Sequence, residues 1–599
     1  MNISQHLVKY INQTLKCNHI FTLTGGGAMF LNDAVGNEHD IKAIYCHHEQ
    51  ACAMAAVGYA KLNGIGVCVT TTGCGATNTL TGLLDAWQDN VPVLFISGNV
   101  KSKETTYLSG KSLRSFGVQE FNIIPVVTSF TKAAYFVDSF DSYLNLLPKI
   151  KNNLLKGRPG PIWIDIPMDI QSYHLDELSQ EKLKVVISRE LVKIKLKPKR
   201  ASIEIVHKKL EKAKKPVFLV GNGLRLSNYG EGINFLKNIS KDLSIPIVTT
   251  YLGVDFFKKD ENYFGPVGLK ASRVANLILN NSDLIICIGT RLATSVIGFE
   301  YELFANDAFK IIVDIDSEEH TKKTINPDLF IHSDAYNFLL EFQKNLSKIN
   351  KYDWLMRCYK ASKEIPIQEQ FSKNNKISIY DVVKSVCRYS NSNDVIVSDA
   401  GSSYYVSSIM FERHFNQRYI TSGAQADMGF ALPAGIGCAF AKNKDRIHII
   451  TGDGSIQLNI QELQTIFHYK LNISIYILNN NGYLSIRTTQ KNFFTGRECG
   501  TDQSNGISFP DFKKIAFAYN IKYEKFNSLY NFAKFLEINK IQTGPIIYNI
   551  LCPEDEAIIP KTKTVKSSSG KLSSAPLTRM APDLSIEKES NLKSLGFNL

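Results

Sequence analysis

A carboxylate stands between two glycines in the stretch TGDGSIQLN, and an asparagine follows it 27 positions later (480 − 453). Asp453 comes after the apolar run 447–451, and Asn480 comes after a second apolar run, 473–478. Residues 459–469, between the two runs, carry apolar side chains at helical spacing. A right-handed β-α-β crossover places its two strands side by side and parallel. We therefore expect Asp453 and Asn480 to meet at the carboxyl edge of a sheet, where open α/β sheets bind ligands.

One carboxylate and one carboxamide oxygen suit a hard cation such as Mg²⁺, which completes its shell with phosphate oxygens and water. Gly452 and Gly454 let the backbone approach a ligand closely, and the N-terminus of the following helix favours a phosphate. The simpler alternative is that GDG is a tight turn and NNNG a loop. The joint spacing favours a site for a magnesium diphosphate.

A second candidate is Glu49, in the stretch IKAIYCHHEQACAMAAVGYAKLNG. This stretch predicts a strand, a short turn and a helix of small residues, with Glu49 near the helix start. An isolated glutamate there has a purely structural interpretation, because it stabilises the helix dipole by about 0.3–1 kcal/mol.

The chain of 599 residues is too long for a single core. Short β-branched runs alternate with glycine turns and helical patterns, which predicts an α/β protein with three doubly wound parallel-sheet domains. We expect these domains at residues 1–172, 196–345 and 376–556. The charged stretch 180–200 is predicted to be a linker. The tail, 557–599, is so polar that an extended arm or lid is expected.

Composition narrows the class of protein. Hydrophobic residues make up 44% and charged residues 21%, as in ordinary globular proteins. No run of eighteen apolar residues predicts a membrane span, and the N-terminus has a helical pattern instead of a signal peptide, so we expect a cytoplasmic protein. The eleven cysteines lack metal-ligand spacing. The net charge of +13 is spread without a basic stripe, so no nucleic-acid partner is expected.

GDG followed after about two dozen residues by a double asparagine resembles the diphosphate-binding motif of thiamine-diphosphate enzymes. More narrowly, GDGSIQLNIQELQT and TSGAQADMGFALPAGIG resemble the acetolactate synthase group, and the resemblance extends from Met1 to Pro553. It implies a pyrimidine-binding, a middle and a diphosphate-binding domain, with thiamine diphosphate and Mg²⁺ as cofactors. By this resemblance Asp453, Asn480 and the carbonyl of Gly482 ligate the metal.

The resemblance also implies the roles of other residues. Glu49 would protonate the aminopyrimidine ring of the cofactor, Gln119 would reach the active site, and Met428 would hold the cofactor in a bent shape. The positions expected at the pyrimidine end are Gly25, Thr72, Gly73 and Asn78. Those expected around the diphosphate are Gly401, Ser402, Ser403, Gly452, Gly454, Ser455, Tyr483 and Leu484, although the family often has a Gln-His pair where Ser402 and Ser403 stand.

The implied reaction is decarboxylation of a 2-oxo acid, with pyruvate expected, and transfer of a two-carbon unit to an aldehyde or ketone. Acetolactate synthesis, decarboxylation without ligation and a catalytically silent cofactor-binding subunit are the alternatives. The resemblance also implies a homodimer or homotetramer, in which Glu49 acts on cofactor held by the partner chain.

The chain departs from the family pattern in two places. Ala293, Thr294 and Ser295 replace polar and charged residues of the flavin segment, so FAD, an ADP-like nucleotide and no nucleotide all stay open for the middle domain. Gln490 stands where the synthases carry a tryptophan. With Arg487 it would suit a hydroxylated or phosphate-bearing acceptor such as a keto sugar, and the alternative is a simple drift of pocket shape.

Overall fold

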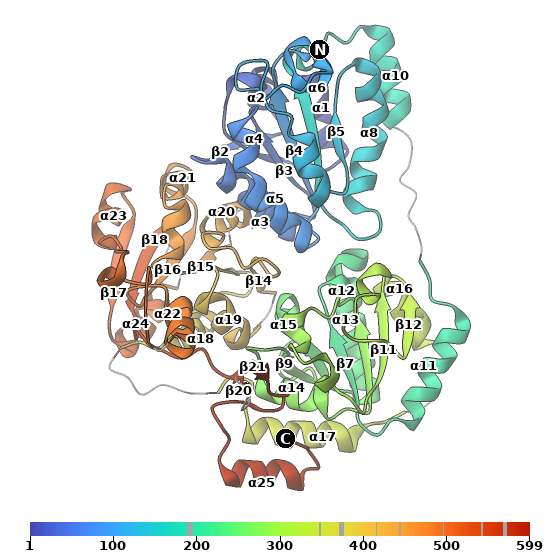
Figure 1. Ribbon diagram of the computed structural model, residues 1–599, viewed down its shortest axis with the longest axis vertical. Helices are drawn as coiled ribbons and strands as arrows, with labels where there is room; N and C mark the ends of the chain where they lie inside the picture. Colours follow the sequence, from blue (N-terminus) through green and yellow to red (C-terminus); the bar gives the residue numbers. More distant parts are fainter. Residues whose placement is uncertain are drawn as a thin grey trace.

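The computed structural model describes the chain except for residues 188–195, 345, 347–348, 370–375, 415, 443–444, 495, 541–542 and 567–571. Three separate six-stranded sheets, parallel throughout, have helices packed against them (Figure 1). The predicted fold class, α/β with three doubly wound parallel sheets, is therefore confirmed. The domain boundaries given above stay predictions. In the described residues no helix is both long and apolar enough to cross a bilayer.

The N-terminal and C-terminal sheets share one topology. Each has the strand order 2-1-3-4-6-5 when strands are counted along its own domain. The N-terminal strands are β1 (His19–Thr22), β2 (Lys42–Tyr45), β3 (Gly66–Thr70), β4 (Val93–Asn99), β5 (Ala134–Phe136) and β6 (Ile162–Pro167). The C-terminal strands are β13 (Val395–Ser398), β14 (Arg418–Ile420), β15 (Ile447–Gly452), β16 (Ile473–Asn479), β17 (Lys522–Phe526) and β18 (Ile546–Leu551).

The middle sheet has a different order. It runs β12-β11-β10-β7-β8-β9, which is 3-2-1-4-5-6 read from the opposite edge and is the doubly wound order of dinucleotide-binding domains. Its strands are β7 (Pro216–Val220), β8 (Ile247–Thr249), β9 (Tyr263–Pro266), β10 (Leu284–Ile288), β11 (Phe309–Asp314) and β12 (Leu329–His332).

Five helices position the candidate site. They are α3 (Glu49–Asn63), α19 (Ser402–Met410), α20 (Ala431–Lys442), α21 (Glu462–His468) and α22 (Leu484–Phe493). The other longer helices that cover the sheets are α1 (Ile3–Gln13), α2 (Met29–Asn37), α5 (Leu80–Gln88), α8 (Phe140–Leu155), α11 (Arg200–Lys212), α13 (Glu231–Leu243), α14 (Arg273–Asn280), α16 (Ala335–Gln343), α18 (Ile379–Tyr389) and α24 (Leu529–Ile538).

Helices α3 and α20 join the N-terminal domain to the C-terminal domain. Both are rich in small residues, so their backbones touch: a Cβ at Gly58 would overlap the backbone of Ala434, and one at Gly437 would overlap the carbonyl of Ala55. Apolar residues from both domains form one continuous buried cluster around this contact. The close approach fixes how the two sheets are placed relative to each other.

Buried ion pairs add to these contacts between domains. The Lys61 ammonium lies 2.7 Å from the Asp89 carboxylate, which also accepts hydrogen bonds from the backbone N–H groups of residues 423 and 424. Asp255, in the middle domain, is bridged by Arg225 of the same domain and by Arg418 of β14. The hydrogen bonds to Asp89 and the Asp255–Arg418 pair therefore link different domains.

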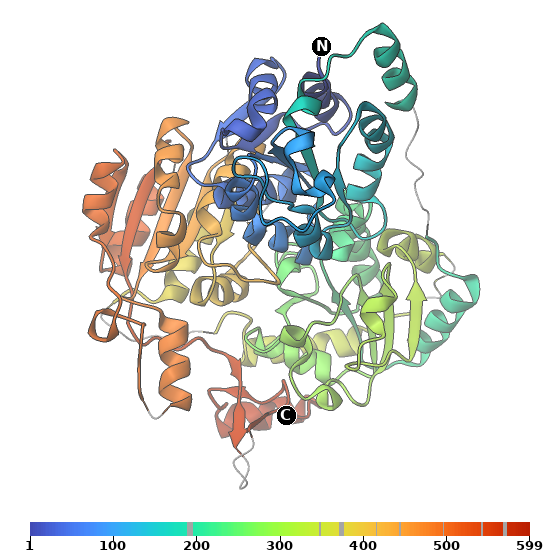
Figure 2. The same ribbon diagram turned by 45° about the horizontal axis from the view of Figure 1, so that its top comes forward.

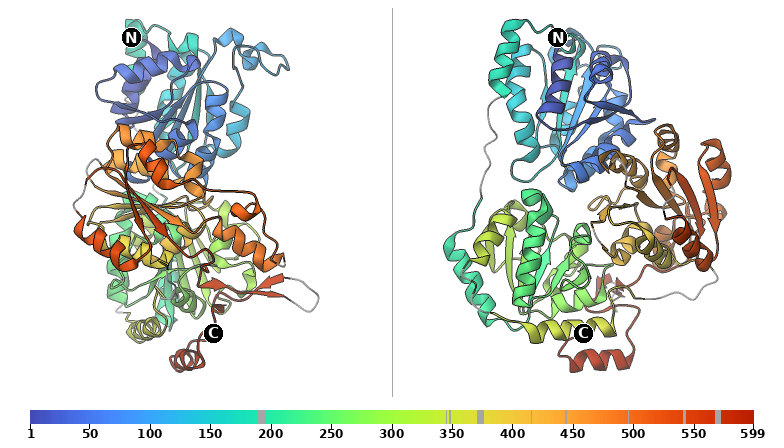
Figure 3. Two further views of the ribbon diagram at one scale, coloured as in Figure 1. Left: turned by 90° about the vertical axis from the view of Figure 1, so that its left-hand side faces the viewer. Right: turned by 180° about the vertical axis from the view of Figure 1, so that it is seen from behind.

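The C-terminal residues differ from the extended arm that their polarity predicts. Helix α25 (Ile586–Ser594) lies beside α17 (Tyr352–Glu364) below the middle domain, as two views show (Figures 2 and 3). Leu577, Met580, Leu592 and Phe597 are buried, and three of them join the middle-domain core; Met580 instead lies beside Asn276. Four well-spaced apolar residues anchor the segment although its average composition is polar.

The first part of the stretch predicted to be a linker, 180–200, is helical instead. Helix α10 (Glu177–Ile187) extends into it and buries Leu183 against the N-terminal domain. Residues 188–195 of the predicted linker lie outside the described residues.

The helix contact leads to a stability prediction. Gly437→Ala inserts a methyl group against the Ala55 carbonyl, and such overpacking costs about 1–3 kcal/mol. We expect a lower denaturant midpoint, followed by intrinsic fluorescence. The control is Gly36→Ala in α2, where the nearest atom to a new Cβ is 3.9 Å away, so up to about 1 kcal/mol should be gained. Equal midpoints for Gly437→Ala and the wild type would contradict the tight contact.

Candidate functional site

The segments that carry the two oxygen-bearing side chains singled out first lie against each other. Strands β15 and β16 are parallel neighbours, with Gly452 opposite Leu478, so Asp453 and Asn480 follow adjacent strand ends. One carboxylate oxygen of Asp453 accepts the N–H of Gly454 at 2.9 Å, and the other accepts the N–H of Gly482 at 3.1 Å. The backbone thus holds the carboxylate against the 480–482 loop.

The residues present fit a bound cation. The Asn480 side chain is buried, and its Oδ1 accepts no hydrogen bond from the described part of the chain. Such an oxygen, on a loop whose backbone bonds a carboxylate that is 1% exposed, needs an explanation, and a hard cation provides one. Burial raises the pKa of Asp453 to about 6, and a neighbouring cation would lower this pKa again.

Helix N-termini converge at the same edge. Gly401, at φ +65°, precedes α19, and a Cβ there would lie 3.2 Å from the hydroxyl of Ser485 in the first turn of α22. Gly454 has to be a glycine because a Cβ would overlap the ring of Tyr483. The first turns of α19 and α22 therefore adjoin, and the free N–H groups of such turns attract phosphate. The Ser403 hydroxyl is instead bonded to the carbonyl of its own turn at residue 400.

Sequence reasoning did not single out Asp399, the residue that directly follows β13. This buried carboxylate accepts hydrogen bonds from the N–H of Ala400 and, at 2.8 Å, from the hydroxyl of Thr451. It also accepts from the backbone of residues 429–430, and burial raises its pKa to about 6. Asp399 thus links the loop before α19, strand β15 and the loop that carries Met428. The sequence feature that could have identified Asp399 is an acidic residue directly after a buried strand.

Met428 is half-buried in the turn before α20. The carbonyl of Gly429 beside it accepts a hydrogen bond from Asn459 at 2.8 Å, and the same amide nitrogen lies 3.8 Å from the sulfur of Met54 in α3. The loop that carries Met428 is therefore fixed both by the GDG segment and by the N-terminal domain.

A second group of predicted residues gathers in the N-terminal domain. Glu49 is the first residue of α3, and the ring nitrogen Nδ1 of His48 caps this helix by accepting the N–H of Gln50 at 3.0 Å. Asn78 donates a hydrogen bond to Glu49 Oε2 at 3.0 Å, and a Cβ at Gly75 would lie 3.4 Å from Oε1. Glu49 and Asn78 are thus brought together, and His48 has a structural role.

The turn after β3 completes this group. Gly73 has φ +59°, and a Cβ there would overlap the carbonyl of Gln119, so the exposed Gln119 lies against the same turn. The Thr72 hydroxyl donates to Asn99 at 3.0 Å inside the core, so it is already engaged. At Gly25, after β1, a Cβ would overlap the side chain of residue 71.

The two groups remain separate within one chain. Among the described residues no recorded hydrogen bond or ion pair joins Glu49 to Asp453 or to the 480–484 segment. The turn before Glu49 contacts α21 instead, through a hydrogen bond from the His47 N–H to Glu462 at 3.0 Å. Each domain carries one half of the expected site.

The middle domain has a cavity at the carboxyl ends of β7, β10 and β11. Gly221, Gly289, Arg291, Ser295 and Asp314 line it, and residues of the other two domains close its rim. Because β7 and β10 lie on either side of the point where the strand order reverses, the cavity occupies the usual ligand position of doubly wound sheets.

The two residues expected to face an acceptor are engaged elsewhere. Both polar atoms of the Gln490 amide bond the backbone of Cys499. The amide oxygen accepts from the Cys499 N–H at 2.9 Å, and the amide nitrogen donates to the Cys499 carbonyl at 3.1 Å. Arg487 is buried among carbonyl and carboxylate oxygens. Both side chains therefore serve local structure, because the segment after α22 folds back onto that helix.

Comparison with protein-family models gives three matches. The N-terminal TPP binding domain of thiamine pyrophosphate enzymes matches residues 1–123, their central domain matches residues 203–342, and their C-terminal TPP binding domain matches residues 399–547. Thiamine pyrophosphate is another name for thiamine diphosphate. The three matches fall on the three sheets in order.

Curated relatives match almost the whole chain. The acetolactate synthase large subunit of Lactococcus lactis is 29% identical over 92% of each chain, and the acetolactate synthase isozyme 2 large subunit of Escherichia coli is 29% identical over 92% of this chain and 96% of its own. The probable acetolactate synthase large subunit of Methanocaldococcus jannaschii is 30% identical over 90% of each chain. The chain therefore belongs to the acetolactate synthase-like family of thiamine-diphosphate-dependent enzymes.

Proposed function

We propose that this enzyme uses thiamine diphosphate and Mg²⁺ to decarboxylate a 2-oxo acid, pyruvate, and to transfer the resulting two-carbon unit to an aldehyde or ketone. The buried pair of Asp453 and Asn480 carries the proposal, because an amide oxygen without a partner beside a buried carboxylate fits a metal ion. The names of the relatives, acetolactate synthases, support the choice of donor and the carboligase reaction.

In this proposal Asp453, Asn480 and the carbonyl of Gly482 hold Mg²⁺, and the first turns of α19 and α22 hold the diphosphate. The chemistry that thiamine diphosphate supplies when bound is stabilisation of the carbanion left by loss of CO₂. Glu49 holds the proton for the aminopyrimidine nitrogen. Asn78 fixes Glu49 Oε2, which leaves Oε1 for the proton transfer.

We also propose that a homodimer is the smallest active unit, because the two half-sites lie in different domains without a recorded bond between them. The loop around Gln119 supports this proposal. It exposes several large apolar side chains, Leu108, Leu113, Phe116, Val118 and Phe121, and Val118 is 82% exposed. An apolar patch of this kind beside a half-site is typical of an interaction surface. A homotetramer built from two such dimers remains compatible with these features.

Product analysis separates the alternatives. Acetolactate from pyruvate alone would identify an acetolactate synthase, and free aldehyde would identify a non-ligating decarboxylase. Turnover that rises with a keto sugar would identify a sugar acceptor, which would then be recognised by residues other than Arg487 and Gln490. A silent subunit would bind the cofactor and release no CO₂, although such a subunit has no need of the Glu49–Asn78 pair.

The catalytic role of Glu49 gives the first functional prediction. With thiamine diphosphate, Mg²⁺ and pyruvate, Glu49→Gln should release CO₂ more slowly than the wild type by roughly 10²–10⁴-fold, the usual range for loss of a general acid. The control is Glu177→Gln, since Glu177 is also the first residue of a helix but is exposed. Equal losses in both variants, or none in Glu49→Gln, would contradict the role.

The proposed metal site gives a second prediction, which is tested by thermal unfolding instead of by activity. Ligand at a hundred times its Kd stabilises a protein by about 2.7 kcal/mol. We expect thiamine diphosphate with Mg²⁺ to raise the wild-type Tm, and EDTA or Asn480→Ala to remove most of that rise. Asn481→Gly is the matched control, because Asn481 has an exposed side chain and φ +56°, which glycine tolerates. A full rise in Asn480→Ala would refute the ligand assignment.

We further propose that the middle-domain cavity binds a nucleotide, either FAD or an ADP-like molecule. Protein purified without added nucleotide should release a nucleotide on heat denaturation, detected by chromatography with ultraviolet absorbance. FAD would also give the native protein a visible absorption spectrum, and an ADP-like molecule would not. The proposal fails if no nucleotide is released and neither FAD nor ADP raises the Tm of the purified protein.

A further inference from the structure

We infer that Arg487 is a positioning residue for the cofactor site. It holds the 480–483 loop against Asp453 and ties the segment 496–505 to the back of that loop. The inference rests on the proposed function, since it assigns a role toward the same metal and diphosphate.

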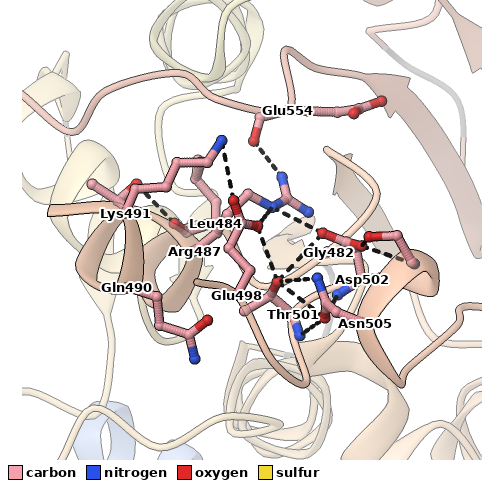
Figure 4. Close-up of polar contacts among 12 residues, drawn as sticks. Gly482, Leu484, Arg487, Gln490, Lys491, Glu498, Thr501, Asp502, Asn505 and Glu554 are labelled. Carbon is pink, nitrogen blue, oxygen red and sulfur yellow. Dashed lines mark hydrogen bonds and ion pairs between the residues drawn. The ribbon is translucent and has the colours of Figure 1, made fainter. Parts of the chain in front are cut away.

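The side chain of Arg487 is placed for this role by α22. The backbone N–H of Arg487 donates to the carbonyl of Tyr483 in the first turn of that helix, at 2.9 Å, and the guanidinium turns inward and is buried. Figure 4 shows it in the middle of a ring of oxygens that come from several parts of the chain. An exposed arginine would reach toward substrate, whereas this one reaches into the protein.

The guanidinium bridges three segments. Its Nη2 donates to the carbonyl of Asn481 at 2.9 Å, and its Nη1 donates to the carbonyl of Glu554 after β18. Its Nε lies 3.3 Å from a carboxylate oxygen of Asp502 and 3.7 Å from one of Glu498. Nε makes these ion pairs without a hydrogen bond of its own to any described residue, and Arg487 is only 5% exposed, so two carbonyls and two carboxylates are the surroundings of the group.

Both Arg487 and Asp453 contact the proposed metal loop. A Cβ at Gly482 would overlap both Arg487 Nη2 and the carbonyl of Thr501, so the loop has no room to move back. The N–H of Gly482 donates to Asp453 at 3.1 Å, and the N–H of Tyr483 donates to the Thr501 carbonyl at 2.9 Å. The position of the Asn480 and Gly482 oxygens is therefore set jointly by Asp453 and Arg487.

Charge gives Arg487 a second effect on the same site. Glu498 and Asp502 are acidic residues close to the proposed metal loop, which lies next to the first turn of α22 that would hold the anionic diphosphate. The guanidinium offsets part of their negative charge, and without it their repulsion of the diphosphate would be stronger. A lysine would restore one charge but not the planar fork that bonds several oxygens at once.

A matched control lies one turn further along α22. Lys491 is also cationic and also pairs with Glu498, at 3.5 Å, but its side chain is 48% exposed. It bonds no carbonyl of the 480–483 loop among the described residues. Removing it should change the charge of the same acidic segment without releasing the loop.

The test compares Arg487→Lys, Arg487→Met and Lys491→Met. Binding of thiamine diphosphate is measured by calorimetry over a series of Mg²⁺ concentrations, and the Tm of the ligand-free proteins is measured beside it. Loss of a residue that orients metal ligands typically costs 10–100-fold in affinity. We expect both Arg487 variants to weaken thiamine diphosphate binding by that factor and to need more Mg²⁺ for half-saturation. Lys491→Met should bind like the wild type.

Wild-type binding in Arg487→Lys would overturn the inference, and so would a lower ligand-free Tm with unchanged cofactor and Mg²⁺ affinity. If Arg487→Met does not fold, Arg487→Lys decides alone, because it keeps the charge. If Lys491→Met lost as much affinity for thiamine diphosphate as the Arg487 variants, net charge instead of loop position would control cofactor binding. That result would also overturn the inference. A wild-type protein that binds no thiamine diphosphate with Mg²⁺ would overturn the proposed function itself, whereas good wild-type binding with unchanged variants refutes only the role of Arg487.

Discussion

The arrangement of the site depends on a carboxylate buried at the end of a parallel strand. Asp453 is almost inaccessible, and its oxygens are held by the N–H groups of Gly454 and Gly482. Burying a negative charge is costly unless it is compensated, and the raised pKa of Asp453 reflects that cost. In the proposed site, a metal ion held by Asp453 and by the Asn480 oxygen that accepts no hydrogen bond from the described residues would compensate this charge.

The candidate site residues are distributed over two sheets of the same topology. The N-terminal and C-terminal domains share one strand order, and each presents its site residues at the carboxyl edge next to its own switch point. The contact of α3 with α20 fixes the two domains to each other through glycines that no larger residue can replace without strain. Glu49 stays on one domain and Asp453 on the other, which is why a second chain is proposed to complete each site.

The helix after the metal loop shows how polar residues near a site can serve the site indirectly. Gln490 and Arg487 have the chemistry to bind a polar acceptor, yet both bond the segment that folds back after α22. Each would leave a backbone group or a carboxylate unsatisfied if it turned to a substrate. In the proposed reaction, acceptor selection would therefore rest on other side chains.

The sequence by itself determined the three parallel sheets and the meeting of Asp453 with Asn480, because hydrophobic period and spacing along one β-α-β unit are local properties. It also grouped Glu49 with Asn78 through family resemblance. Only the tertiary structure decided the contacts of Asp399 and Arg487 and the folding of the C-terminal residues onto the middle domain. Asp399 and Arg487 bond other elements of the C-terminal domain, and the C-terminal residues pack on the middle domain. These pairings depend on packing between elements, which local patterns do not record.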